Sequence, residues 1–175
     1  EHSLLSWQEV MGKTRYLMLP TVQQYAREQI GDKDKIEALR QQHARHFLGV
    51  LEDAARKIQG KGQMEGIDRI SADIDNIRTG MDAAIKAGDH QNVVRYSCFL
   101  AGFLRIKGRF DERLTRTQQG MDAANKLNDP QLIAGCQNNL GNAYSDLPTG
   151  DRGKNIAKAI ECYEAALRVY TEKEF

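Results

Sequence analysis

Two segments near the end of the chain carry a pattern of small and aromatic residues that restricts how they can pack. Residues 136–144 read CQNNLGNAY and residues 159–167 read AIECYEAAL. In each segment the apolar residues recur every three or four positions, which is the period of an amphipathic helix. Gly141, Ala159 and Ala166 are small enough for two helix backbones to approach closely, and a tyrosine from each segment fills the space beside them. The two segments therefore predict a hairpin of closely packed helices.

The rest of the chain shows mostly the same periodicity. Two short β-like segments, 3–7 and 15–19, come first and are joined by a polar turn at 11–13. Proline, glycine and aspartate residues then mark helix ends. We expect helices over 20–30, 34–58, 64–87, 92–107, from the turn at 108–111 to 127, and over 130–144 and 155–172. The sequence therefore predicts an all-α fold of antiparallel helical hairpins, stacked as a right-handed superhelix, with a short β-hairpin at the N-terminus.

Individual residues refine this picture. Asp34, followed by Glu37 three residues later, predicts a capping box at the start of the second helix. Tyr25 belongs to the apolar face of the first helix. On the last helix we expect five side chains to face inward: Ile156, Ile160, Tyr163, Leu167 and Tyr170.

The composition excludes several classes of partner. The chain has 175 residues, of which 41% are hydrophobic and 28% charged, and its net charge is +1. This balance gives no global electrostatic reason to expect nucleic acid or an acidic membrane surface. No apolar run approaches the roughly 20 residues that a membrane-spanning helix needs. We therefore expect no membrane partner.

The three cysteines, Cys98, Cys136 and Cys162, are widely spaced and each stands beside apolar residues on a helical pattern. Such cysteines behave as small core side chains, so we expect all three to be buried. A disulfide framework or a metal site would need closer, patterned spacing. This usage of cysteine fits a reducing cytoplasm, which is the location we predict.

Residues 138–167 resemble a tetratricopeptide (TPR) repeat of the lengthened kinesin-light-chain type, because they combine Leu-Gly-x-x-Tyr with Ala-x-x-x-Tyr-x-x-Ala. Leu100-Ala101 precedes Leu140-Gly141 by forty residues, whereas the usual TPR period is about 34. The resemblance implies a clear repeat over 130–172 and a degenerate one over 92–127. In the degenerate repeat Arg113, Thr117 and Gly120 stand where Ala, Tyr and Ala are expected.

The front of the chain is similar to the end of the winged-helix segment in STAND-type (NB-ARC) signalling ATPases, on the residues RYLMLPTVQQYARE at 15–28. HARHFL at 43–48 and DNIR at 75–78 resemble the helices that join this segment to a TPR sensor. The resemblance implies a piece of a larger regulator, divided into a winged-helix end at 1–31, a helical linker at 32–89 and TPR-like repeats at 90–175. It also implies that Asp75 or Arg78 holds the linker to the winged helix.

Other strings do not assemble a catalytic, cofactor or metal site. Residues 150–155 read GDRGKN, which lacks the first glycine of a phosphate-binding loop and ends in Asn155 rather than Ser or Thr. His43 and His46 have a spacing that suits one metal ion, but no third ligand stands nearby. Asp73 lies two residues before Asp75, so the pair points apart on a helix, and we expect Asp73 to be solvated. We therefore predict no enzyme activity and no cofactor for this chain.

The candidate binding site is the groove formed by the first helices of successive hairpins. Asn138 and Asn142 are four residues apart and share a stripe with Asp146. An asparagine amide both donates and accepts hydrogen bonds, which suits the backbone of an extended peptide. Arg95 and Arg105 hold comparable positions one repeat earlier, where they could pair with a carboxylate. The alternative, in which Asn139 or Asn142 bonds a neighbouring helix and Arg95 is simply solvated, stays open.

Together these features predict a protein–protein interaction module, acting as the linker and first sensor repeats of a signalling regulator. We expect a protein or peptide as partner, self-association through the apolar end of the last helix, and no nucleic acid. The alternative is a fragment of a winged-helix transcriptional regulator, whose hairpin with Trp7 would contact DNA. A salt-dependent affinity for duplex DNA would favour this alternative.

Overall fold

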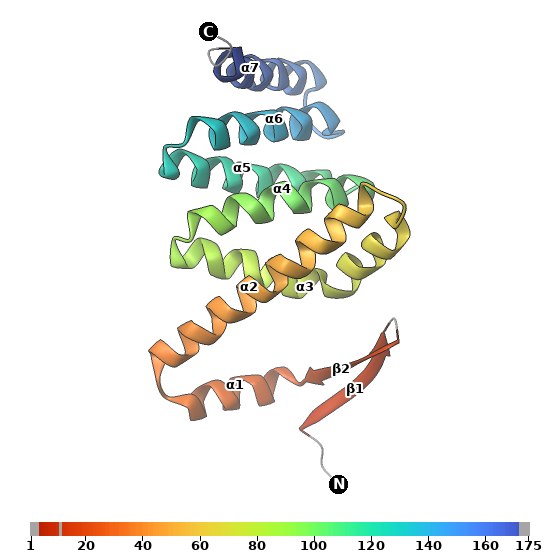
Figure 1. Cartoon of the computed structure of the whole chain (residues 1–175), viewed down its shortest axis with the longest axis vertical. Coiled ribbons are helices and arrows are strands. Elements are labelled where there is room, and N and C mark those ends of the chain that lie inside the picture. The colour runs from red at the N-terminus through yellow and green to blue at the C-terminus, as the bar shows by residue number, and fades with distance from the viewer. Residues whose placement is uncertain (1–3, 11, 172–175) are drawn as a thin grey trace. The chain divides into compact units, whose positions relative to one another are not determined.

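The computed structural model describes residues 4–10 and 12–171, and Figure 1 shows their order along the chain. The chain separates into two compact units, Glu1–His43 and Ala44–Phe175. The division falls inside the segment 32–89 that the sequence suggested as a linker. Each unit is considered by itself below.

The first unit begins with an antiparallel hairpin of β1 (Leu5–Val10) and β2 (Lys13–Met18), in which Trp7 lies opposite Tyr16. The expected hairpin is confirmed, but its strands were placed at 3–7 and 15–19. The strands instead reach Val10 and begin again at Lys13. Gly12 has a φ of 70°, a left-handed backbone that glycine adopts without steric cost. Ser3 and Met11 lie outside the described residues.

Helix α1 (Pro20–Ile30) has the predicted bounds, with proline in its first turn and Gly31 in the left-handed conformation after it. No side chain of α1 is buried, and Tyr25, expected on an apolar face, is exposed. Within the first unit, α1 therefore does not pack against a buried core.

Helix α2 (Lys33–Ile58) starts one residue earlier than expected, and Asp32 rather than Asp34 caps it. The Asp32 carboxylate accepts hydrogen bonds from the backbone N–H groups of Asp34, at 2.9 Å, and Lys35, at 3.1 Å. A capping side chain belongs to the residue just before the first helical turn. The capping box of Asp34 and Glu37 was therefore wrong, because Asp34 is already helical.

The second unit continues as a run of antiparallel helices (Figure 1): α3 (Gln63–Ala87), α4 (His90–Ile106), α5 (Phe110–Leu127), α6 (Pro130–Asp146) and α7 (Arg152–Thr171). Each of these helices packs on the next, and α4 also contacts α6. The all-α fold of helical hairpins with a short N-terminal β-hairpin is therefore confirmed. Helix α4 begins two residues earlier than the periodicity indicated and α7 begins three residues earlier, while α6 ends two residues later.

Aspartate and glycine residues set the helix ends of the second unit. Asp129 accepts hydrogen bonds from the backbone N–H groups of Gln131 and Leu132, as the Asp-Pro pair predicted. Asp89 accepts one from Asn92 at 3.2 Å, which moves the start of α4 to His90. Gly88 ends α3 in the left-handed conformation. The turns are therefore encoded locally.

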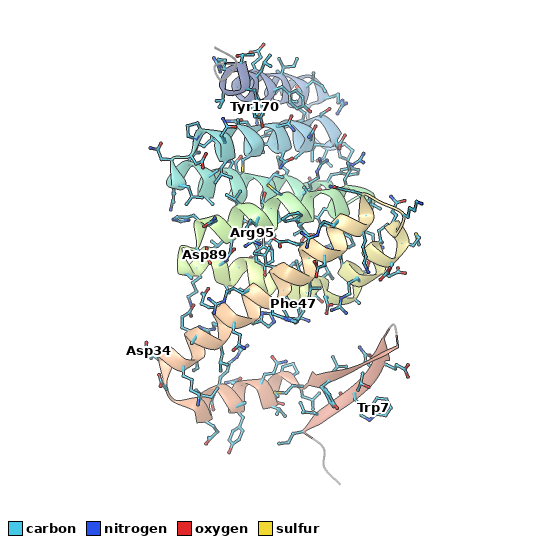
Figure 2. All side chains as sticks on the ribbon, viewed as in Figure 1. Trp7, Asp34, Phe47, Asp89, Arg95 and Tyr170 are labelled. Carbon is cyan, nitrogen blue, oxygen red and sulfur yellow. The ribbon has the colours of Figure 1, made fainter. Side chains whose placement is uncertain are left out.

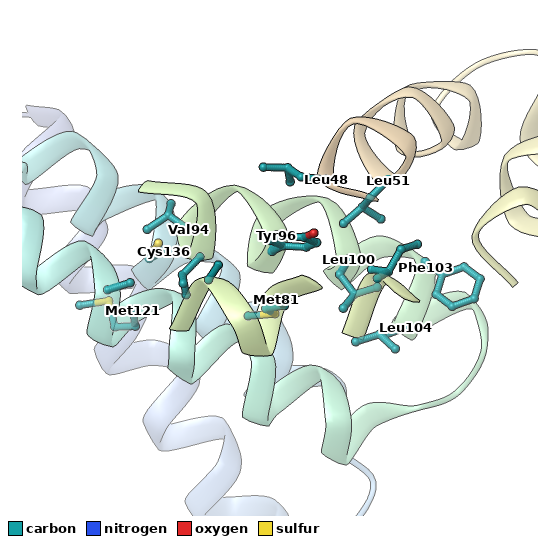
Figure 3. Close-up of a cluster of buried hydrophobic side chains, with 14 of the residues drawn as sticks. Leu48, Leu51, Met81, Val94, Tyr96, Leu100, Phe103, Leu104, Met121 and Cys136 are labelled. Atoms are coloured by element: carbon teal, nitrogen blue, oxygen red, sulfur yellow. The ribbon is translucent and has the colours of Figure 1, made fainter. Parts of the chain in front are cut away.

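The core of the second unit is a continuous cluster of aliphatic and aromatic side chains from α2 to α7, part of which Figure 3 shows. Tyr96 lies fully buried in it, and its hydroxyl donates a hydrogen bond to the Ala44 carbonyl at 2.6 Å. Burying a phenol requires such a partner, because an unpaired hydroxyl would lose its bonds to water. Five aliphatic side chains are also fully buried: Leu51, Ile70, Ile77, Leu100 and Leu104.

The small residues named from the sequence lie where helices meet. A Cβ atom on Gly141 would stand 2.6 Å from a ring carbon of Tyr163 on α7. Ala159 and Ala166 are buried as well. The predicted close approach of α6 and α7 is confirmed, and Gly141 is the residue that permits it.

Two burial predictions were wrong in the second unit. Ile160, Leu167 and Tyr170 on α7 are 50%, 59% and 44% exposed, because α6 covers only one side of that helix among the described residues. Cys98 is exposed, whereas Cys136 and Cys162 are buried as expected. A helical period identifies an apolar stripe but not whether a second neighbour covers it.

Candidate functional site

Helices α4 and α6 are the first helices of successive hairpins and run in the same direction, because the antiparallel helix α5 lies between them in the chain. They contact each other, and the amide Nδ2 of Asn139 donates a hydrogen bond to Cys98 Sγ at 3.4 Å. Side chains three and four residues apart share one side of each helix. We call this side the α4–α6 face, defined by Arg95, Cys98, Gly102 and Arg105 of α4 with Asn138 and Asn142 of α6.

Asn138 is exposed, and its side chain makes no hydrogen bond within the described part of the chain. Both its carbonyl oxygen and its NH₂ group are therefore available to a ligand. Its position on α6 is the one that the repeat pattern assigned to the groove.

Asn142 is half-buried and already holds one partner. The Tyr163 hydroxyl donates to its Oδ1 at 2.9 Å, and its backbone carbonyl accepts from Arg113 at 3.4 Å. This bond to α7 is the structural role that the sequence left open. It also fixes the orientation of the amide, so the Nδ2 donors point away from Tyr163.

Asp146 forms an ion pair with the buried guanidinium of Arg113, at 2.5 Å between Oδ2 and Nη1. A buried charge needs such a partner, because leaving it unpaired is strongly destabilising. The Asp146 carboxylate therefore joins α6 to α5.

Arg95 and Arg105 differ in what they contact. Arg95, labelled in Figure 2, pairs with Glu52 of α2 at 2.6 Å and donates to Asn92 at 2.9 Å. It therefore ties α4 to α2. Arg105 is exposed and forms no ion pair or side-chain hydrogen bond with any described residue. Of the two arginines, Arg105 is the one whose guanidinium is free for an incoming carboxylate.

A row of ion pairs between α3 and α5 was not anticipated. Arg78 holds Glu112 through two bonds, of 2.7 Å from Nε and 2.9 Å from Nη2, and Arg116 contacts Asp82 at 2.5 Å. Arg78 therefore joins α3 to α5. Both pairs span 34 residues and lie four residues apart on each helix. That repeated offset of opposite charges is the sequence signal that could have identified them.

This row of ion pairs changes the acidity of its carboxylate. Partial burial by itself would raise the pKa of Glu112. The hydrogen bond and charge of Arg78, together with the charges of Arg109 and Arg116, outweigh burial and hold the pKa below its ordinary value. Glu112 therefore stays ionised well into the acidic range.

The other polar residues singled out from the sequence have structural surroundings. Asp73, expected at the surface, is only 3% exposed and pairs with Arg69 at 3.4 Å. That prediction was wrong because the side of α3 that carries Asp73 is buried together with its stripe of apolar side chains. His46 is exposed, and its ring stands edge-on to the Phe47 ring with 4.9 Å between the ring centroids. In the described residues no three His, Cys, Asp or Glu side chains gather as a metal site would require.

The GDRGKN string starts α7. The Asp151 carboxylate accepts the backbone N–H of Lys154 at 3.1 Å, and Asn155 is buried and donates to the Thr149 carbonyl at 2.8 Å. These bonds explain the polar residues of the string as a helix start.

Comparison of the chain with protein-family models, with curated proteins and with solved structures gave no match. The helices of residues 4–10 and 12–171 include none with the length and apolarity of a membrane span.

Proposed function

We propose that helices α3 to α7 form a protein-recognition module that holds an extended, acidic peptide on the α4–α6 face. The single observation that supports this most is the pair Asn138 and Arg105, which are exposed on that face and have no partner within the described chain. Polar side chains without internal partners do not contribute to folding through their own contacts. They offer an amide and a guanidinium to a ligand instead.

The spacing of these groups suits an extended chain. Cys98 contacts Asn139, and Arg105 follows Cys98 by seven residues on α4. At a rise of about 1.5 Å per residue, Arg105 lies about 10 Å further along the face than Asn138. An extended peptide covers that distance in about three residues. Asn138 and the free Nδ2 of Asn142 would hold the peptide backbone, and Arg105 would bind an acidic side chain or C-terminal carboxylate.

The resemblance to STAND regulators extends this proposal to a biological role. The module would be a cytoplasmic sensor, without catalytic activity or cofactor, whose partner shifts a larger regulator between two states. Such a shift requires that the peptide bind one state more tightly than the other. The DNA-contacting alternative stays a prediction that a titration with duplex DNA at low salt can test.

The test is selection of random twelve-residue peptides on the immobilised chain, followed by fluorescence anisotropy titrations of the enriched peptides. We expect acidic peptides, with affinity falling about tenfold or more for Arg105→Ala and about two- to tenfold for Asn138→Ala. Asn125→Ala, at an exposed asparagine of α5, is the matched control and should leave Kd unchanged. Failure to enrich peptides, or equal binding by all three variants, would contradict the proposal.

A further inference from the structure

Two of the three cysteines lie together although 38 residues separate them in sequence. Cys98 is exposed on α4, and Cys136 is 3% exposed on α6, where Figure 3 shows it near Val94 and Met121. Both cysteines lie where α4 and α6 contact each other, and Asn139, one turn after Cys136 on α6, bonds to Cys98. Cys136 Sγ also lies 3.7 Å from the Gly120 carbonyl oxygen, so its S–H can donate either to that oxygen or to Cys98.

A third group completes the cluster. The Nδ2 of Asn139 donates to Cys98 Sγ at 3.4 Å, so two donors converge on one exposed sulfur. When the Cys136 S–H rotates from the Gly120 carbonyl toward Cys98, it stabilises a thiolate on Cys98 without any movement of the backbone. The arrangement therefore favours the ionised, nucleophilic form of Cys98 and the protonated form of Cys136.

The acidity of the two thiols follows from these contacts. The hydrogen bond from Cys136, opposed by burial and assisted by Asn139, lowers the pKa of Cys98 to about 7. Donation to Cys98 and burial raise the pKa of Cys136. The lowered pKa favours the thiolate of Cys98, and the thiolate is the reactive form of cysteine.

We propose that Cys98 and Cys136 form a redox-active dithiol, which small disulfides such as oxidised glutathione convert to an intramolecular disulfide between α4 and α6. This inference stands independently of the peptide-binding proposal. It rests on the position of both cysteines where α4 contacts α6, on the exposure of Cys98 and on the donor from Asn139.

The reaction is thiol–disulfide exchange in two steps. The Cys98 thiolate attacks one sulfur of the small disulfide, a Cys98–glutathione bond forms, and the glutathione thiolate leaves and takes a proton from water. Cys136 then loses its proton to solvent and attacks the Cys98 sulfur, and a second glutathione leaves. Two electrons pass from the protein thiols to the small disulfide, which is reduced to two thiols.

Cys162 provides a matched control within the same chain. It is buried on α7, and burial, together with the charge of Glu161, raises the pKa of its thiol. No thiol partner of Cys162 is recorded in the described chain. It should therefore stay reduced under conditions that oxidise the pair.

The experiment treats the reduced full-length chain with oxidised glutathione at pH 7.5 and follows intact mass and cross-linked peptides by mass spectrometry. We expect loss of two hydrogen atoms and a peptide pair that joins Cys98 to Cys136, unchanged in Cys162→Ser. Cys136→Ala should stop at the mixed disulfide on Cys98, and Cys98→Ser should not react. A wild-type chain that stays reduced, stops at the mixed disulfide or is modified first at Cys162 would overturn the proposal.

A second measurement is the pH profile of alkylation at Cys98 by iodoacetamide. We expect a midpoint near pH 7 in the wild-type chain and a higher midpoint in Cys136→Ala. At pH 7 the wild-type rate should exceed that of an unstructured cysteine peptide about fivefold, since the larger thiolate fraction outweighs its lower intrinsic nucleophilicity. An ordinary thiol midpoint that the Cys136→Ala change does not move would contradict the inference. Far-UV circular dichroism of each variant shows that the helices are retained.

Discussion

At the scale of single residues, the glycines of α6 show how one hydrogen atom in place of a methyl group decides helix packing. Gly141 faces the Tyr163 ring, whereas Gly135 on the same helix has open space around its Cβ position. Tyr163 also donates its hydroxyl to Asn142. A side chain at position 141 would therefore displace both the ring and this hydrogen bond.

Gly141→Ala should destabilise the chain by about 1–3 kcal/mol, because the added methyl would overlap the Tyr163 ring and force it to shift. Gly135→Ala should instead stabilise it by about 0.5–1 kcal/mol, because alanine is the better helix former and meets no neighbour. Urea unfolding followed by circular dichroism measures both. Equal effects of the two substitutions would show that Tyr163 does not limit the space at Gly141.

The residue scale is also where the sequence was least reliable. The pattern around Gly141 predicted its contact correctly, because small residues at a fixed spacing have a direct steric meaning. Cys98 and Asp73 were misplaced, because burial depends on which neighbouring helices cover a side chain, and a single helical period does not contain that information. The Cys98–Cys136 contact needed the packing of α4 on α6 to become visible.

At the scale of helices, charged side chains join elements that are not consecutive in the chain. The Arg78–Glu112 pair links α3 to α5 through two hydrogen bonds, with less than a quarter of either side chain exposed. Paired charges at this depth contribute more than ion pairs at the surface. The pair of Asp53 and Arg56 on α2 is largely exposed and provides the comparison.

Glu112→Gln should lower the free energy of unfolding at pH 7 by about 1–3 kcal/mol, while Asp53→Asn should change it by less than about 0.5 kcal/mol. The folded-state pKa of Glu112 is depressed, so its stabilisation is present above the unfolded pKa of about 4.3 and is lost as pH falls through the folded pKa. The difference in stability between wild type and Glu112→Gln should therefore shrink as the pH falls below the unfolded pKa and through the folded pKa of Glu112. Urea titrations at a series of pH values test this, and a difference that persists in acid would contradict it.

Helix existence and type were predicted well from the sequence, since apolar periods of three and four and the Asp, Pro and Gly signals are local. The helix ends shifted by one to three residues where a different side chain supplied the cap, as Asp32 does for α2. The ion pairs between α3 and α5 were not anticipated, because their partners come from different hairpins and only the repeated offset of 34 residues signals them in the sequence.

At the scale of the whole molecule, the two units differ in how much they bury. Among the described residues the buried core lies in the second unit, whereas several large apolar side chains of the first unit are exposed, including Trp7 at 68% exposure. Trp7 is the single tryptophan of the chain. Fluorescence therefore reports on the first unit alone, and far-UV circular dichroism reports mainly on the helices.

We expect the two signals to separate during urea unfolding. Circular dichroism at 222 nm should show a cooperative transition from the second unit, whereas the Trp7 emission maximum should already be that of a solvated indole and should hardly move. Steady-state fluorescence recorded along the same titration checks this. A blue-shifted maximum that moves to the red together with the helical signal would show that Trp7 is covered in the folded chain.

The exposed side of α7 has a consequence for how stability is distributed along the second unit. A stack in which each helix mainly contacts its neighbours behaves as a one-dimensional chain of coupled units. Among the described helices, α5 has neighbours before and after it, whereas α7 relies on α6 alone. Opening α7 costs one interface and opening α5 costs two, so local fluctuations should grow toward α7. The Tyr163–Asn142 bond, which orients an amide of the α4–α6 face, crosses the interface between α6 and α7, so fraying of α7 would loosen the proposed peptide site before the core responds.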